Sequence, residues 1–179
     1  MKDLGEAKEV VGIEIERDRR SGKISLTQKG YLQKILQRFN INDDTKSIST
    51  PLAPHFKLKA TMSLITVEER EYITHVSYAS TVGSLMYAMV CTRPDLSQAV
   101  SMINRYMHDH DRGHWEAIKW VLRYIKDTID VGLLFEKDSI GKQECVGYVD
   151  SDYAGDLDKC RFITEYVFTL SQVQVSWCL

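Results

Sequence analysis

The sequence predicts an α+β fold, and three observations support that prediction. Residues 9–27 alternate between apolar and polar side chains on either side of a polar turn at Gly22, which indicates a β-hairpin. The middle of the chain carries apolar residues at helical spacing. After residue 130 the period returns to two. We therefore expect an N-terminal β-hairpin and helix, a three-helix middle and a C-terminal antiparallel meander.

The first helix is expected directly after the hairpin. Thr27 is a suitable N-cap, and the apolar stripe that follows it consists of Tyr31, Leu32, Ile35, Leu36 and Phe39. Residues 40–70 contain Pro51 and Pro54 and show weak periodicity. They are predicted to be mostly loop, with a short extended piece near Ile48.

Three further helices are predicted over about residues 75–91, 94–108 and 112–127. Pro94 suits the first turn of the second of these helices. The third turns an apolar face inward and leaves Lys119, Arg123 and Lys126 largely outside. The strands of the expected meander are VGLLF, ECVGYVD, TEYVFTL and VQVSW.

Composition restricts the possible functions. The chain has 179 residues, enough for one domain or a small pair, and 44% of them are apolar, as in a globular protein with a core. The net charge of −2 excludes the broad basic field of a self-sufficient nucleic-acid binder. The charged start and the short longest apolar run, residues 85–91, predict a soluble intracellular protein without a membrane partner. The four cysteines show no metal-ligand spacing and are expected to be free thiols.

The stretch YVDSDYAGDLDKC, residues 148–160, places four aspartates close together after an apolar run. In a strand Asp150 and Asp152 share one face, with Asp156 and Asp158 in the loop beyond. Clustered carboxylates suggest a divalent-metal site, and a solvated acidic turn is the simpler alternative.

Three specific types of aspartate site fit this stretch poorly. An EF-hand loop is contradicted by Ala154 and Arg161 at ligand positions. An aspartyl phosphatase needs a larger α/β domain after the motif than the remaining residues provide. A polymerase palm needs two adjacent aspartates, whereas Asp150 is followed by Ser151.

Almost the whole chain resembles the Pol polyprotein of copia-type LTR retrotransposons. The matching segments occur in the family's order and are MKDLGEAKEVVGIEI, KISLTQKGYLQKILQRF, STPL, YASTVGSLMYAMVCTRPDLSQAV, HWEAIKWVLRYIKDT and GYVDSDYAGDLDK. The resemblance implies that residues 1–130 are the C-terminal, thumb- and connection-like region of reverse transcriptase. It implies that residues 131–179 are an incomplete RNase H-like domain, so that the meander is a truncated RNase H sheet.

By this resemblance Asp150 corresponds to the first metal-binding carboxylate of RNase H, and Asp152 is a neighbour of lesser standing. RNase H chemistry uses two Mg²⁺ ions on the scissile phosphate, and one aspartate cannot hold both. No Asp or Glu follows Glu165, and the family's paired polymerase aspartates lie before MKDLG. We therefore expect a fragment with a remnant site at Asp150, with no tightly bound metal, and with no polymerase or nuclease activity of its own.

The chain departs from the family pattern at two places. RFITEYVF, with Phe162, Ile163 and Glu165, replaces the usual approach to the second RNase H strand. SQVQ, residues 171–174, replaces a glycine-rich turn, and positive φ is costly there without glycine. Both departures put the local hairpin in question.

Two basic groups are candidate contacts for the phosphates of a template-primer or an RNA/DNA hybrid, and both are also consistent with solvated charge. The first is a turn and the second a helix face, and together they comprise Arg17, Arg19, Arg20, Lys23, Lys119, Arg123 and Lys126. His110 and His114 have a spacing that can chelate a metal on a helix, but Asp111 to Gly113 indicate a helix break between them.

Two alternatives to an inactive Pol fragment stay open. One is a retained interaction module that binds nucleic acid or pairs with intact Pol copies through its helices and open sheet edge. The other is a nuclease completed in trans by a partner that carries the missing glutamate.

Overall fold

The computed structural model describes most of the chain, and the account below concerns those residues. They are 5–42, 44–46, 48–56, 58, 77–108, 110–137, 144–156 and 161–178. The first half has the elements β1 (Glu9–Val10), β2 (Ile13–Asp18), β3 (Lys23–Thr27), α1 (Lys29–Arg38) and α3 (Tyr78–Cys91). The second half has a 3₁₀ turn η1 (Pro94–Leu96), then α4 (Ser97–Asn104), α5 (Arg112–Asp127), β4 (Leu133–Glu136), β5 (Cys145–Asp156), β6 (Arg161–Leu170) and β7 (Val173–Cys178).

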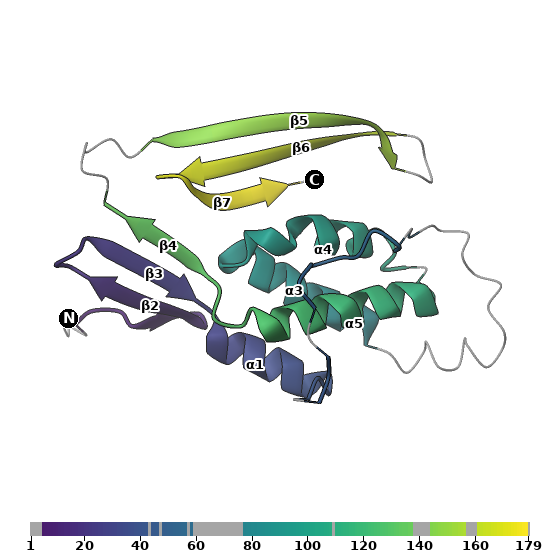
Figure 1. The fold of residues 1–179 in the computed structure, drawn as a ribbon, viewed down its shortest axis with the longest axis horizontal. Coiled ribbons are helices and arrows are strands. Elements are labelled where there is room, and N and C mark those ends of the chain that lie inside the picture. Colours follow the sequence, from purple (N-terminus) through teal and green to yellow (C-terminus); the bar gives the residue numbers. More distant parts are fainter. Residues whose placement is uncertain are drawn as a thin grey trace.

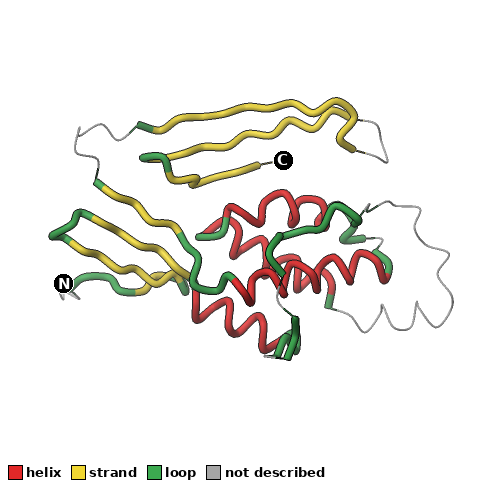
Figure 2. The backbone as a smooth tube through the Cα atoms, viewed as in Figure 1, coloured by secondary structure: helices red, strands yellow, loops and turns green. Residues whose placement is uncertain are grey.

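The α+β fold expected from the sequence is confirmed. Two antiparallel sheets, with strand orders β1-β2-β3-β4 and β5-β6-β7, accompany a group of helices. Figure 1 shows the first sheet beside the helices and the second sheet lying over them. In Figure 2 the strands of the first sheet lie to the left of the helices, and those of the second sheet lie above them. None of the helices in the described ranges is long and apolar enough to cross a membrane.

The N-terminal hairpin around Gly22 is present, with a second hairpin before it. β1 and β2 are joined by Val11 and Gly12, whose φ values of +52° and +75° suit a tight hairpin turn. The expectation that Thr27 caps the first helix is wrong, because Thr27 is the last residue of β3 and the N-cap is Gln28. The Glu14 carboxylate instead accepts a hydrogen bond of 2.8 Å from the backbone N–H of Gly30 in the first turn.

The expectation that VGLLF is the first strand of the C-terminal meander is also wrong. This segment is β4, which pairs with β3 at Leu26↔Leu133 and Ile24↔Phe135. Gly132 permits the close approach, because a Cβ atom at that position would lie 2.2 Å from the carbonyl oxygen of Leu26. The meander therefore consists of β5, β6 and β7, and the division of the chain at residues 130 and 131 stays a prediction.

The three helices of the middle are confirmed, with one boundary corrected. The segment predicted over 94–108 begins as the 3₁₀ turn η1 and ends as α4 at Asn104. The loop prediction for residues 40–70 agrees with the described residues of that segment, which contain no helix or strand. Among them, no strand occurs near Ile48. Residues 59–76 lie outside the described residues, as does the predicted start of the helix at 75.

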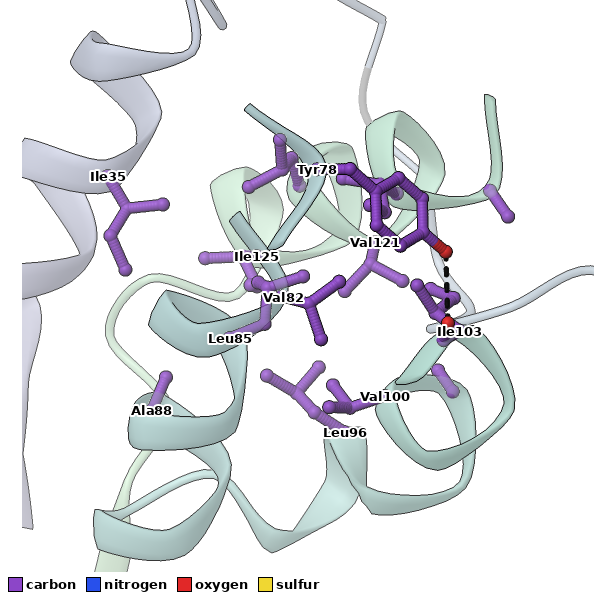
Figure 3. Packing of buried hydrophobic residues seen from close by; sticks show 14 of the residues in the cluster. Ile35, Tyr78, Val82, Leu85, Ala88, Leu96, Val100, Ile103, Val121 and Ile125 are labelled. Carbon is purple, nitrogen blue, oxygen red and sulfur yellow. Dashed lines mark hydrogen bonds between the residues drawn. The ribbon is translucent and has the colours of Figure 1, made fainter. Parts of the chain in front are cut away.

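The main hydrophobic core lies among the helices. Figure 3 shows its centre, where Val82 and Leu85 of α3 meet Leu96 and side chains of α4 and α5. The hydroxyl of Tyr78 donates a hydrogen bond of 2.9 Å to the carbonyl oxygen of Ile103 (Figure 3), and burial raises the pKa of Tyr78. Apolar periodicity thus identified the inward face of each helix.

A buried ion pair joins the helices to one another. The Arg93 side chain is fully buried, and its Nε and Nη2 atoms donate hydrogen bonds of 2.9 and 2.7 Å to the Asp95 carboxylate. Its guanidinium also donates to the carbonyl oxygen and hydroxyl of Thr128, just after α5. The Tyr124 hydroxyl donates to Asp95 at 2.9 Å. This arrangement fixes the end of α5 against the start of η1.

The second sheet is only partly covered. β7 lies against η1 and α4, and β7 also touches β4. On one face of the sheet Val149, Tyr166 and Phe168 are exposed, with Val149 at 75%. The turn between β6 and β7 is present despite the lack of glycine, and Ser171 and Gln172 adopt φ values of +50° and +66°. The hairpin questioned from the sequence thus forms with two residues in a strained conformation.

The buried ion pair predicts a large difference between two Asp→Asn substitutions. Asp95→Asn removes the anion facing a fully buried guanidinium, and we expect it to lower the free energy of unfolding by about 2–4 kcal/mol. The range extends down to about 2 kcal/mol because the Asp95 side chain is 33% exposed and water partly screens its charge. Asp130→Asn, which breaks the exposed pair with Lys29, is the matched control and should change it by about 0–1 kcal/mol. Urea unfolding of the two variants measures this, and equal losses would contradict the role given to Arg93.

The strained turn predicts a stabilising double substitution. Asn-Gly is the preferred pair for a two-residue hairpin loop with positive φ at both positions. We expect Ser171→Asn with Gln172→Gly to raise the free energy of unfolding by about 1 kcal/mol and Tm by roughly 2–4 °C. Gln172→Ala keeps a Cβ atom at positive φ and should give no gain in thermal melts. A gain of the same size for Gln172→Ala would show that strain is not the cause.

Candidate functional site

The two candidate aspartates lie on one long strand of the second sheet. Asp150 and Asp152 belong to β5, where alternate residues share a face. In the register with β6, Asp150 is directly opposite Glu165 and Asp152 is opposite Ile163. Asp150, Asp152 and Glu165 therefore share one face, and directly opposed residues of an antiparallel pair have Cβ atoms about 4.5–5.5 Å apart.

The other two aspartates of the cluster differ from expectation or lie outside the described residues. Asp156 was expected in a loop, but it is the last residue of β5 and pairs with Arg161 after a register shift. The irregularity between Asp152 and Asp156 lengthens the strand beyond the point where the sequence indicated its end. Asp158 falls in 157–160, outside the described residues.

The donor chemistry on this face fits a hard divalent cation. Asp150 and Asp152 are carboxylate residues two positions apart on one strand, and carboxylate oxygens are ligands that Mg²⁺ prefers. Opposed carboxylates also repel one another unless a cation or hydrogen-bond donors offset their charge. Among side chains that the structure describes, no group of three or more His, Cys, Asp or Glu is arranged to hold a metal ion. Metal binding at Asp150 thus stays a prediction from the backbone register and the residue types.

The four cations of the basic turn differ in their pairing. Arg19 forms an ion pair with Glu6, and Lys23 Nζ lies 2.6 Å from the Glu136 carboxylate. Arg17, at the end of β2, and Arg20, in the turn, are exposed and take part in no ion pair recorded among the described residues. Arg17 and Arg20 are therefore the members of this group best placed to meet an external anion.

The cations of α5 are more engaged than expected. Lys119 pairs with Glu116 at 2.6 Å. Lys126 was expected to be largely outside, but it is half-buried and donates to the carbonyl oxygens of Asn42 and Thr45 at 2.8 and 2.9 Å. Arg123 is half-buried and has no recorded ion pair in the described chain. The β2–β3 turn lies at the far end of the first sheet from α5 (Figure 1), so the two basic groups do not form one patch.

A cleft of about 740 Å³ lies beside the basic turn. One wall is the apolar face of the first sheet, with Ile24, Leu26 and Phe135, and the other includes Leu170 and Ser171 from the β6–β7 turn. Arg17, Arg19 and Lys23 also line it. Sequence reasoning found these cations but missed the cleft, because it assigned the β4 segment to the other sheet.

The two candidate histidines lie on either side of the start of α5. His110 precedes α5 and stacks on Tyr78, with ring centroids 4.0 Å apart. His114 is inside α5, next to the Tyr106 ring, and its backbone N–H donates at 3.0 Å to the Asp111 carboxylate that caps the helix. The helix boundary at Asp111 separates the two side chains, as the sequence indicated. Cys91 and Cys145 are free thiols, as expected.

Comparison with known proteins gives several relatives over nearly the whole chain, and transposon Pol polyproteins are among them. The retrovirus-related Pol polyprotein from transposon TNT 1-94 of Nicotiana tabacum is 47% identical over 178 residues, which cover 99% of this chain and 13% of the polyprotein. The Pol polyprotein from transposon RE2 of Arabidopsis thaliana is 34% identical over 163 residues, covering 91% of this chain and 10% of the polyprotein. This chain therefore spans only about a tenth of the length of these relatives.

A shorter relative is matched over a larger share of its own length. The uncharacterized mitochondrial protein AtMg00810 of Arabidopsis thaliana is 36% identical over 177 residues, covering 99% of this chain and 68% of that protein. No family model matches the chain, and no solved structure does. Over nearly its whole length, the chain is therefore similar to one segment of the retrovirus-related Pol polyproteins of transposons.

Proposed function

We propose that this segment is the C-terminal part of a copia-type reverse transcriptase followed by the first strands of its RNase H domain. The observation that carries the proposal is the aspartate motif GYVDSDYAGDLDK, whose residues 147–156 lie on β5, an edge strand of a three-stranded antiparallel sheet downstream of a helical region. The relatives' names support a Pol polyprotein, and the region within it is our assignment. The activity of the whole polyprotein would be RNA-directed DNA synthesis and degradation of the RNA strand of a hybrid.

In this proposal Asp150 is a ligand of catalytic Mg²⁺, and Asp152 has a supporting position two residues along the same face of β5. Bound Mg²⁺ ions would supply activation of the attacking water and charge stabilisation of the leaving oxygen. The role of this chain's residues is to hold a carboxylate at a fixed place on a sheet. β6 fixes that place, because the ladder from Cys145↔Leu170 to Asp152↔Ile163 is continuous.

These 179 residues alone are expected to be inactive. Two ions on one phosphate need more carboxylates than Asp150 and its neighbour provide. Glu165 lies opposite Asp150, but two carboxylates on adjacent strands at the same level are a smaller set than a two-metal site uses. The proposal therefore needs further ligands from the longer polyprotein.

Cleavage of an RNA/DNA hybrid tests the assignment. We expect no Mg²⁺-dependent cleavage and no primer extension by the purified 179-residue chain, and cleavage by a longer polypeptide continued along the tobacco relative's sequence. In the longer polypeptide, Asp150→Asn should reduce cleavage by more than the roughly 10- to 100-fold typical for losing a hydrogen-bond partner of a metal ligand. Asp152→Asn should have a smaller effect.

Glu144→Gln is the matched control, since it removes an exposed carboxylate just before β5 and away from Asp150 and Asp152. It should leave cleavage nearly unchanged. Cleavage by the 179-residue chain that disappears with Asp150→Asn would overturn the expected inactivity. Full activity of the longer Asp150→Asn variant would overturn the RNase H assignment itself.

A second candidate function is an interaction module that binds nucleic acid or pairs with intact Pol copies. The observation that favours nucleic acid is that Arg17 and Arg20 at the β2–β3 turn are exposed and lack a recorded ion pair within the described residues. Because the net charge is −2, such binding has to be local and sensitive to salt.

The salt dependence of duplex binding tests which basic group is used. Each phosphate contact contributes about one unit to the slope of log affinity against log salt. We expect Arg20→Gln to reduce the slope for an RNA/DNA duplex by about one, and Arg123→Gln on α5 to reduce it less. Arg105→Gln, an equal change of charge at an exposed site on the end of α4, is the control and should leave the slope unchanged. Equal effects of all three would indicate a response to net charge only.

A further inference from the structure

The cleft beside the basic turn combines two kinds of surface. Its lining residues come from β2, β3, β4, the turn between β2 and β3, and the turn between β6 and β7. They are Arg17, Asp18, Arg19, Gly22, Lys23, Ile24, Leu26, Phe135, Glu136, Lys137, Leu170 and Ser171. A volume of about 740 Å³ lies within the range of roughly 300–1,000 Å³ that ligand sites occupy.

The floor of the cleft is apolar and includes an aromatic ring. The register aligns Arg17, Ile24 and Phe135 in one row across three strands, so these residues share a face of the sheet. Leu26 belongs to the next row on the same face, and Leu170 contributes from the opposite wall. Ile24 is 39% exposed although it lies on an inner strand. This face is therefore apolar and partly open to solvent.

The rim of the cleft favours an anion. Asp18 and Glu136 also line the cleft. They alternate with Arg17 and Phe135 along their strands, so their side chains leave the sheet on the face opposite to the apolar floor. The Ser21 hydroxyl and the N–H groups of Arg20 and Ser21 donate to Asp18, which lowers the pKa of that carboxyl. Glu136 pairs with Lys23.

Two of the cations at the rim are left for an external anion, whereas both carboxylates of the rim have partners within the chain. Arg17 and Lys137 are exposed, and no ion pair is recorded for either among the described residues. The Lys137 backbone N–H donates at 3.0 Å to the Gly22 carbonyl oxygen, which holds the start of this side chain at the cleft. A ligand with an anionic group attached to a flat apolar body is complementary to this combination of charge and floor.

We propose that this cleft binds an unpaired nucleotide of a single-stranded nucleic acid. The base lies against Phe135 and Ile24, and the adjoining phosphate meets Arg17 and Lys137. The inference rests on the proposed nucleic-acid role of the chain and names the form of nucleic acid that this site takes. A duplex keeps its bases stacked inside, so only an unstacked base can use an apolar floor.

An acidic peptide is the competing ligand, and the position of the cleft argues against it. Peptides that join a sheet add a strand at its edge, through backbone hydrogen bonds. The cleft lies on the face of β2, β3 and β4, whereas an added strand would pair along the outer edge of β4. Stacking on an aromatic side chain and contact with a cation are the two interactions that single-strand binding sites combine.

Fluorescence anisotropy with the purified 179-residue chain tests the proposal against four probes. They are a DNA strand of about 12 nucleotides, an abasic strand with the same number of phosphates, a blunt duplex of the same length and an oligoglutamate peptide. We expect the single strand to bind at least about fivefold more tightly than the abasic strand and the duplex, because a stacked base adds to the phosphate contacts. The peptide should bind more weakly than all three.

Variants locate the site. Phe135→Leu keeps an apolar floor without the aromatic ring, and it should remove most of the preference for the single strand over the abasic strand. Arg17→Gln should lower the salt slope by about one for both strands, while Arg105→Gln changes neither quantity. Circular dichroism melts establish that each variant is folded. If Phe135→Leu unfolds, Ile24→Thr at a part-exposed position tests the same floor.

Each possible result either supports or overturns the proposed base site in the cleft. Equal binding of the base-containing and abasic strands, or an unchanged preference in the folded floor variant, overturns the cleft as a base site. Tighter binding of the duplex also overturns it, but leaves the proposed contact of the basic turn with duplex phosphates intact. Preferred binding of the peptide assigns the cleft to a protein partner and overturns the proposal. Hybrid cleavage by the longer polypeptide is measured independently of all these results.

Discussion

The buried guanidinium of Arg93 determines how the two halves of the structure meet. It lies between the end of α3 and η1, and it donates to Asp95 and to both oxygens of Thr128. Thr128 ends α5, and its carbonyl oxygen also accepts a hydrogen bond from the Val131 N–H at 3.0 Å. The chain therefore leaves the helices in a fixed direction, which brings Gly132 against Leu26 and β4 onto β3. A guanidinium without access to water needs these partners, so the path of the chain after α5 is tied to a single buried charge.

The pairing of β4 with β3 has consequences for both candidate sites. It supplies Phe135 to the apolar floor of the cleft, and it separates the first sheet from β5, β6 and β7. The second sheet then returns over η1 and α4 through β7, and its β6–β7 turn closes one side of the cleft. The strained residues Ser171 and Gln172 belong to that turn. Backbone strain and the cleft thus occur at the same point, where the two sheets approach each other.

Local patterns were sufficient to predict the elements but not their pairing. Helical spacing identified the buried faces of α1, α4 and α5, and alternation identified β2, β3, β5, β6 and β7. The partner of β4 was missed because an alternating segment fits either sheet. The close approach of Gly132 to the Leu26 backbone accompanies the pairing of β4 with β3, and only the folded chain reveals it. The cap of α1 was missed for a similar reason, since the acceptor Glu14 is distant in sequence. For the candidate site, the sequence indicated Asp150 and Asp152, whereas the position of Glu165 opposite Asp150 depends on the register.

Net charge constrains how this chain can hold nucleic acid. The net charge is −2, and Lys23, Lys119 and Lys126 are engaged within the chain, so few cations of the two basic groups remain to displace the counterions of a phosphate backbone. Phosphate contacts alone would then give weak binding that disappears as salt rises. A base on an apolar floor adds free energy that depends little on salt, since it comes from removing apolar surface from water and from stacking. In the proposed site, Arg17 and Phe135 lie in one row of the sheet on either side of Ile24, so a phosphate contact and a base contact would be made side by side.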